Sequence, residues 1–327
     1  MHLVAVQMEL DVKDYWNETL FRKKIDSIMQ KIESERKGDD PTLVVFPEDT
    51  GLMLVAQGYK NSLQNVNNIS IGIEKLSKNL FLKTLWTKIV YDLPWVPALF
   101  YNRHQQIART YFKVFSEMAA KYEVYLVGGS VILPDYEIED GKALIKKPLD
   151  SKVYNISYLF DPRGNIIGKQ KKVNLIELEA EDALNLNKGK TEELEVFETE
   201  LGKIGIAICL DAFEDRVIEK LVEKDADILV QPSANPGKWD QDQQQEWLFS
   251  SYKRVFIDRK FRYAVNPMMV GSLWNIDFYG QSGIIADRDQ ISEENTGYKD
   301  LGNMPGFVKT AGTEKEEEVI IVKVPLL

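Results

Sequence analysis

Three reactive side chains in this sequence stand at the ends of segments whose composition predicts buried strands. They are Glu48, Lys172 and Cys209. A thiol can attack a carbonyl carbon, a carboxylate can accept the thiol proton, and an ammonium can hold the charge that develops on the carbonyl oxygen. If the three strand ends converge, these groups are sufficient for cysteine-dependent acyl transfer without a histidine.

The strongest local pattern surrounds the cysteine. Residues 204–208 form an apolar run rich in β-branched side chains, which predicts a strand inside a covered sheet. Residues 214–224 then predict an amphipathic helix. A nucleophile on a strand-to-helix turn is exposed, and the backbone N–H groups after it can bind an oxyanion. Taken alone, Cys209 fits better as a small buried hydrophobe, which is what most lone cysteines are.

The other two residues also have plain interpretations. A glutamate after a strand is commonly a solvated turn or a helix cap, and lysines at a strand end commonly contact solvent. Strand alternation places Lys169 and Lys171 on the face opposite Lys172, so the lysines of this segment are not equivalent.

Histidine and cysteine are scarce. The chain has two histidines, His2 and His104, and one cysteine, so a structural zinc site of the Cys/His type is not available. We expect no metal and no other cofactor. Only His104 could pair with Cys209, which makes a carboxylate the expected base. A single cysteine also excludes an internal disulfide and fits a reducing cytosol.

The overall charge limits the partners. Lys and Arg total 41 against 51 Asp and Glu, a formal net charge of −10. This excess argues against a nucleic-acid or anionic-membrane surface. Residues 1–7 are too short and too quickly polar for a secretory signal, and no apolar run approaches the length of a membrane span. We therefore expect a cytoplasmic protein that acts on a small molecule.

The pattern of elements predicts a single α/β domain over residues 1–327, without repeats or linkers. Strands at 3–7 and 43–46 with a helix between them predict a βαβ unit and a parallel pair. Segments 153–160 and 166–173 predict a hairpin. Further helices are predicted at 73–92, 106–121 and 241–260. The expected architecture is a mixed sheet, or two sheets, clothed in helices.

Three motifs follow one another in order. They are Phe-Pro-Glu at 46–48, Gly-Lys-Gln-Lys-Lys-Val-Asn-Leu at 168–175, and Gly-Ile-Ala-Ile-Cys-Leu-Asp at 205–211. With the segments at 126–130, 154–155 and 226–234, this arrangement resembles the carbon–nitrogen hydrolase (nitrilase) superfamily over almost the whole chain. The resemblance implies a four-layer α-β-β-α sandwich of two stacked sheets with helices outside. It also implies a homodimer or a higher homo-oligomer.

The resemblance implies a role for each residue. Glu48 would be the general base and later protonate the departing nitrogen, and Cys209 would form a thioester. Lys172 and the backbone N–H of Leu210 would stabilise the tetrahedral intermediate.

Many members of the superfamily carry a second glutamate shortly after the lysine, which positions it. Glu179 is the first candidate for this position and Glu181 is the second.

Three features depart from the family pattern. Asn174 replaces a common histidine, where we expect an effect on packing. Leu-Asp rather than Trp-Glu follows the cysteine, which favours the amidase-like branches over true nitrilases. The aromatic-rich segment 60–103 is longer than usual and is placed to roof the pocket, to extend an oligomer contact, or simply to pack outside.

Substrate contacts are predicted after the segment 231–234. Asn235 or Trp239 could bind the polar end of the substrate, although such loops are often only turns. No arginine stands out as a carboxylate clamp.

The leading hypothesis is a cysteine-dependent hydrolase that releases ammonia or an amine from a small linear amide. The alternative within the fold is an N-carbamoyl (ureido) amidohydrolase. A nitrilase, an acyltransferase and a non-catalytic scaffold protein are further possibilities.

Overall fold

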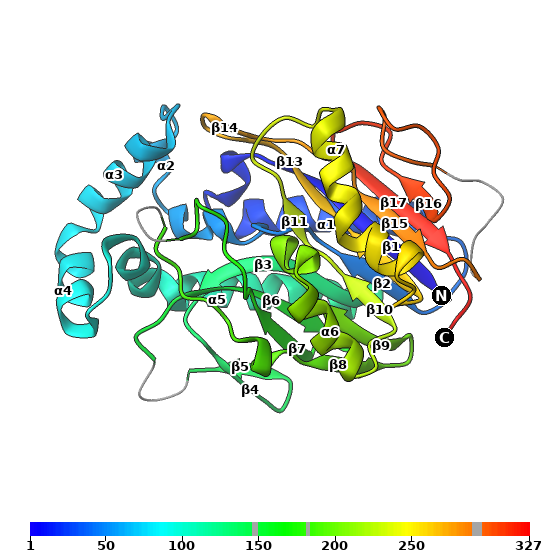
Figure 1. Cartoon of the computed structure of the whole chain (residues 1–327). Coiled ribbons are helices and arrows are strands. Elements are labelled where there is room, and N and C mark those ends of the chain that lie inside the picture. The colour runs from blue at the N-terminus through cyan, green and yellow to red at the C-terminus, as the bar shows by residue number, and fades with distance from the viewer. Residues whose placement is uncertain (146–149, 181–183, 290–295) are drawn as a thin grey trace.

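The computed structural model describes residues 1–145, 150–180, 184–289 and 296–327 (Figure 1). These residues form two large sheets and a small hairpin. The first sheet has the order β11 (Ser233–Ala234), β13 (Met268–Leu273), β1 (His2–Leu10), β2 (Thr42–Val45), β3 (Tyr125–Leu133), β6 (Tyr154–Phe160), β7 (Ile166–Lys171). Strand β14 (Ile276–Phe278) also pairs with β13, and β17 (Glu318–Lys323) pairs with β1.

The second sheet stacks on the first. Its order is β16 (Phe307–Thr310), β15 (Gly283–Ala286), β12 (Tyr263–Asn266), β10 (Ile228–Val230), β9 (Gly202–Ile206), β8 (Val196–Thr199). Both sheets contain parallel and antiparallel pairs. The small hairpin pairs β4 (Glu137–Glu139) with β5 (Lys142–Leu144).

Helices cover the outer face of each sheet, which makes the α-β-β-α sandwich (Figure 1). The first sheet is covered by α1 (Glu18–Glu35) and α5 (Trp95–Tyr122). The second is covered by α6 (Asp215–Glu223), α7 (Gln241–Trp247) and the π-helix η5 (Leu248–Ile257). Short 3₁₀ turns are η1 (Val12–Tyr15), η2 (Leu52–Ala56), η3 (Thr191–Glu193) and η4 (Cys209–Phe213). The fold class expected from the sequence is confirmed.

Strand β1 shows why two layers form on its two sides. Val4, Val6 and Met8 belong to the apolar cluster under α1 and α5, whereas Leu3 and Ala5 belong to the cluster between the sheets. Successive side chains of a strand point to opposite faces, so an uninterrupted apolar strand must be buried on both. The parallel pairing of β1 with β2 confirms the predicted βαβ unit.

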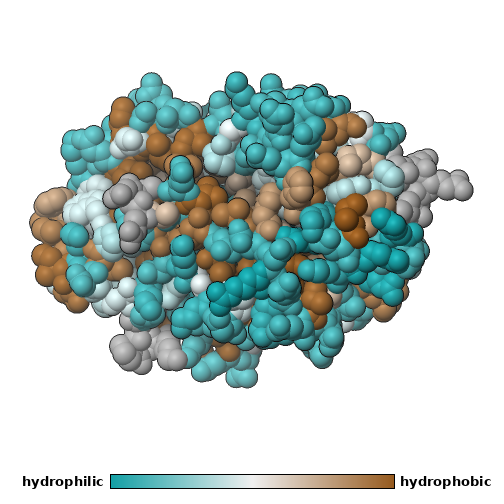
Figure 2. Space-filling view, in the orientation of Figure 1, coloured by the Kyte–Doolittle hydropathy of each residue, from teal (hydrophilic) through white to brown (hydrophobic). Residues whose placement is uncertain are grey.

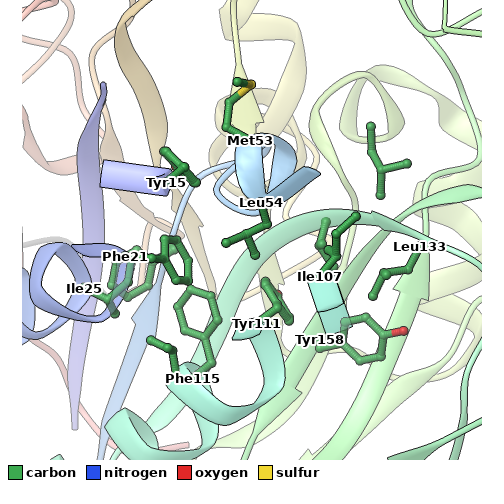
Figure 3. Close-up of a cluster of buried hydrophobic side chains, with 14 of the residues drawn as sticks. Tyr15, Phe21, Ile25, Met53, Leu54, Ile107, Tyr111, Phe115, Leu133 and Tyr158 are labelled. Atoms are coloured by element: carbon green, nitrogen blue, oxygen red, sulfur yellow. The ribbon is translucent and has the colours of Figure 1, made fainter. Parts of the chain in front are cut away.

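Aromatic side chains, among them Phe21 and Phe115, lie together in the apolar cluster between the first sheet and its helices (Figure 3). Phe21 of α1 packs edge-on against Phe115 of α5, with ring centroids 6.0 Å apart. Phe115 in turn packs against Phe46 at 5.4 Å. Such edge-to-face pairs add stabilisation beyond the buried area alone. They position the end of β2 relative to both helices.

Three predicted helices differ from the observed ones. The segment 73–92 is split at Leu80 into α3 (Ile69–Asn79) and α4 (Phe81–Tyr91), which follow the short α2 (Lys60–Leu63). The helix predicted at 106–121 begins earlier, at Trp95. The Gln-rich helix at 241–260 is kinked at Ser250, where α7 passes into η5.

A bulge in β3 supports the segment after Glu48. The register of β3 against β6 shifts between Val127 and Ser130, where Gly129 has φ +66°. Ser130 Oγ accepts a hydrogen bond from the N–H of Asp49 at 3.0 Å, and the Ser130 carbonyl accepts one from Gly51 at 2.8 Å. The predicted kink at the glycine pair thus holds the turn that follows the candidate base.

Gly129→Ala should be strongly destabilising, because a Cβ there would lie 2.0 Å from the Pro47 carbonyl oxygen. The matched control is Gly58→Ala, since Gly58 also has a left-handed φ (+89°) but has open space around it. The left-handed conformation alone costs about 1–2 kcal/mol in the control. We expect the clash at position 129 to cost a further ~1–3 kcal/mol. Urea denaturation of both variants checks this, and equal losses would contradict it.

Candidate active site

A buried lysine lies between two carboxylates. The Nζ of Lys172, directly after β7, donates hydrogen bonds to Glu48 Oε1 at 2.7 Å and to Glu179 Oε2 at 2.5 Å. Lys172 has 0% exposure, and both glutamates are also buried. A buried ammonium is strongly unfavourable unless it is paired and hydrogen-bonded. The two carboxylates supply that compensation.

An asparagine links the same two carboxylates. Asn155 Nδ2 on β6 donates to Glu48 Oε1 at 3.0 Å and to Glu179 Oε1 at 2.8 Å. Glu179 Oε2 also accepts the N–H of Ile176 at 3.1 Å, which closes the loop after Lys172 onto the cluster. The sequence analysis identified Asn155 only as part of a family motif. Its place beside Lys172 in the hairpin register was the signal that could have identified this contact.

Cys209 stands on a strained turn at the start of η4, beyond β9. Its φ is +50°, a left-handed conformation that is costly for a residue with a Cβ. Hydrogen bonds hold the turn: its N–H donates to the Pro232 carbonyl at 2.9 Å, and its carbonyl accepts from Gln231 Nε2 at 3.1 Å. The Sγ lies 3.8 Å from the Ala234 carbonyl oxygen. Gln231 is therefore a support of the turn that the sequence did not reveal.

Asp211 ties this turn to the loop that carries Lys172. Its carboxylate accepts the N–H of Val173 at 3.1 Å and that of Asn174 at 2.7 Å, together with the Asn174 side-chain amide at 2.9 Å. Burial raises the pKa of Asp211 to about 6 despite these donors. Asn174 is thus held to Asp211 through both its backbone and its side chain.

The cluster favours a neutral thiol at rest. Burial raises the pKa of Cys209 well above its ordinary value, the Glu48 carboxylate raises it further, and Lys172 opposes both. Burial raises the pKa of Glu48 to about 7, against the lowering influence of Lys172. Burial lowers the pKa of Lys172, but Glu48, Cys209 and Glu179 outweigh it and keep the lysine charged. The Glu48 carboxylate raises the pKa of the Cys209 thiol, and the thiol in turn lowers the pKa of Glu48, so the two groups are electrostatically coupled.

Cys209 opens into a cavity of about 390 Å³ that is lined by residues of η4, of the segment 234–236, of α7 and of the start of η5. Its walls are mainly apolar: Ile176, Leu210, Phe213, Pro236, Trp247 and Phe249. The polar lining residues are Asn235, Gln243 and Glu246. Leu210 follows Cys209 in the first turn of η4, where backbone N–H groups lack partners within the turn.

The two predicted substrate-binding residues lie in different environments. Asn235 lines the cavity, but its Nδ2 already donates to the Tyr279 carbonyl at 3.1 Å. Trp239 is buried in the apolar core, and its Nε1 donates to Gln281 Oε1 at 3.2 Å. It packs behind the wall, against Trp247, with ring centroids 5.7 Å apart. The structure therefore does not bring Trp239 into the cavity of Cys209.

The remaining candidates are also placed. Glu179 contacts Lys172 directly, and Glu181 lies outside the described residues. His104 is buried in α5, with Nδ1 2.7 Å from the Tyr136 hydroxyl oxygen, and burial lowers its pKa to about 4. His104 thus has its contacts in the outer aromatic core.

The aromatic-rich segment 60–103 contributes to the lining of a second cavity, of about 310 Å³. Its lining includes the carboxylates of Asp49 and Glu179 and, from α3, Ile69, Ser70 and Ile73. Desolvation, Glu48 and Glu179 raise the pKa of Asp49 well above its usual range. Part of the segment 60–103 therefore roofs a space next to Glu179.

The sandwich and the Glu–Lys–Cys arrangement define the class of protein to which the chain belongs. The family model described as carbon-nitrogen hydrolase matches residues 82–300, and the chain is a member of that family. The matched segment contains Lys172, Glu179 and Cys209 and begins after Glu48.

Individual relatives are similar at low identity. Omega-amidase NIT2 of Danio rerio is 27% identical over 159 residues, which are 46% of this chain and 52% of that protein. The chain thus spans about half the length of this curated relative. Nit3 of Saccharomyces cerevisiae, described as a member of branch 10 of the nitrilase superfamily, has a TM-score of 0.58 at 20% identity, with 98% of this chain and 89% of that chain covered.

The fold is also similar to that of an amidase whose structure was solved with an amide. A mutant of the amidase from Nesterenkonia sp. AN1 in complex with butyramide has a TM-score of 0.58 at 13% identity, with 100% of this chain and 91% of that chain covered. At such identities the structural similarity establishes the nitrilase fold.

The pKa of Glu48 predicts the acid side of the pH profile. Because a general base must be ionised and this pKa is raised to about 7, kcat/KM should fall about tenfold per pH unit below pH 7. Glu179 raises the pKa of Glu48. The variant Glu179→Gln should therefore shift the acid limb of the pH profile, where kcat/KM falls, to lower pH, and it should also lower kcat. Glu177→Gln, an exposed change in the same loop, is the matched control and should leave the limb in place. Amide hydrolysis over a pH series measures the shift. A limb that stays in place or rises in Glu179→Gln would contradict the coupling.

Proposed function

We propose that this protein is an amidase in which Cys209 forms a thioester with the acyl group of a small linear amide. The observation that carries the proposal is the buried Glu48–Lys172–Glu179 cluster, whose charges shift the pKa of a thiol that opens into a cavity. Buried carboxylates, a charged lysine and a neutral thiol in one place are more than a structural core requires. The amidase-like relatives support the same reaction class.

The reaction begins with proton transfer. Glu48 accepts the proton of the Cys209 thiol while the sulfur attacks the amide carbon, and the carbonyl electron pair moves to oxygen. Lys172 and the N–H of Leu210 stabilise the oxyanion. When the oxyanion collapses, the C–N bond breaks, and Glu48 gives its proton to the departing nitrogen.

The second half uses water. Glu48 removes a proton from a water molecule that attacks the thioester carbon, and the C–S bond breaks. The carboxylic acid leaves, and the cysteine sulfur regains the proton from Glu48. The raised pKa of Glu48, about 7, suits a group that both accepts and donates protons near neutral pH. Glu179 and Asn155 keep Lys172 and Glu48 in position.

The cavity supports an uncharged or cationic substrate with an apolar acyl group. Among the described residues that line it, Glu246 is the one carboxylate, and none is Lys or Arg. An N-carbamoyl amino acid or an amide with a free carboxylate would meet Glu246 without a cation to balance it. An amide substrate is therefore favoured over the ureido alternative.

Cys209→Ala should abolish turnover without loss of the fold, because the methyl group fits where the thiol is buried. The test is ammonia release from a panel of amides, ureido acids and nitriles, with circular dichroism as the control for folding. Added hydroxylamine should yield hydroxamate from the wild type if a thioester forms. Full activity of Cys209→Ala would overturn the mechanism.

Glu246→Lys should change the preferred charge of the substrate. We expect kcat/KM for an amide with a terminal carboxylate to rise at least about tenfold relative to that for a neutral amide of equal length, since reversal of one nearby charge changes binding by ~1–2 kcal/mol. Glu219→Lys on α6 is the matched control, because Glu219 is exposed and is not part of the cavity lining. An unchanged ratio in Glu246→Lys would refute this account of the substrate.

A further inference from the structure

Helix α4 is amphipathic, but its polar side faces the protein and its apolar side faces outward. Its buried positions are threonines, Thr84 and Thr87, whereas large apolar side chains point outward. The outward residues and their exposed fractions are Phe81 49%, Leu82 78%, Trp86 61%, Ile89 71% and Val90 52%. Isolated exposed apolar residues are ordinary, but a contiguous set on one helix marks an interaction surface.

This face lies at one end of the molecule. Figure 1 shows α3 and α4 at the left, beyond the sheets, and Figure 2 shows a brown apolar area at the same end. The back of α4 packs on α5. Helix α4 is therefore anchored on α5, with its apolar face directed away from the protein.

The charge around this face is opposite to that of the whole chain. Residues 60–91 contain five lysines and one glutamate, whereas the chain carries a net charge of −10. Within α4, Lys83 and Lys88 lie on the two sides of the apolar face, and the helix has no acidic residue. Helical spacing puts Leu82, Trp86 and Ile89 between the two lysines.

We propose that α4 docks on a membrane surface of anionic phospholipid. An apolar face with aromatic residues, bordered by lysines, is typical of a helix that lies in the interface plane. Phe81, Leu82 and Trp86 enter the boundary between headgroups and acyl chains, and the lysine ammonium groups contact lipid phosphates. Within the described residues no helix is long and apolar enough to cross a bilayer, so contact is peripheral.

Charge also argues against a second copy as the occupant. In a two-fold contact the same patch meets itself, so Lys83 and Lys88 would face the same lysines with no acidic partner on either α4. An anionic lipid surface complements these charges. The net charge of the whole chain pointed away from such a surface, but Lys83 and Lys88 place positive charge on both sides of the apolar face.

Co-sedimentation of the full chain with vesicles tests the proposal. We expect binding to phosphatidylcholine vesicles that contain phosphatidylglycerol, and weak binding to phosphatidylcholine alone. Lys83→Gln and Lys88→Gln should each lower the partition coefficient about fivefold, with a strong dependence on salt. Leu82→Ser with Ile89→Ser should lower it at least about tenfold on both vesicle types. Ile257→Ser, an exposed apolar residue of η5, is the matched control and should bind like the wild type.

Each other outcome overturns the proposal. Thermal unfolding of each variant is the control for folding. In a folded variant, a loss of vesicle binding is due to the changed side chains of α4. Equal binding to neutral and anionic vesicles contradicts the preference for anionic lipid, and wild-type binding by Leu82→Ser with Ile89→Ser contradicts the role of α4. If the wild type ignores vesicles and light scattering shows a dimer that Leu82→Ser with Ile89→Ser dissociates, the face is covered by a second copy.

Discussion

The buried charge of Lys172 is the constraint on which the rest of the site depends. An ammonium with no solvent contact can remain in the core only with closely placed opposite charge, so Glu48 and Glu179 have to converge on it. That requirement sets the registers of three strands, since Glu48 follows β2, Lys172 follows β7, and Asn155 of β6 joins the two carboxylates. The same ion cluster raises the pKa of the Cys209 thiol through Glu48 and lowers it through Lys172. The charges that stabilise the buried Lys172 thus also set the pKa of the Cys209 thiol.

The sequence predicted the layers and the central residues of the site because both depend on local patterns. Apolar runs mark the buried strands, and Glu48, Lys172 and Cys209 stand where those strands end. Alternation along β7 correctly separated Lys172, which is buried, from Lys169 and Lys171, which pair with Asp135. Position along a strand contains this information without knowledge of the fold.

Contacts between distant segments were not accessible in this way. Gln231 supports the turn at Cys209, and Asp211 binds the backbone of the lysine loop, but neither residue lies in a pattern that names its partner. Trp239 was expected to contact the substrate, but it is buried in the core and packs against Trp247 behind the cavity of Cys209. An aromatic residue near an expected pocket is equally suited to either place. In α4 the usual rule, apolar side inward, predicts the wrong face, because threonines pack inward there. Only the fold decides such cases.

The contact between Asp211 and the lysine loop joins parts of the chain that belong to different sheets. Lys172 extends from an edge strand of the first sheet and Cys209 from a strand of the second. Neither sheet contains the reactive pair, so the thiol meets its base and its lysine only after the two sheets have stacked. A chain still emerging from the ribosome, with one sheet formed, would carry an ordinary cysteine. The stacking of the two sheets therefore brings Cys209 next to Glu48 and Lys172.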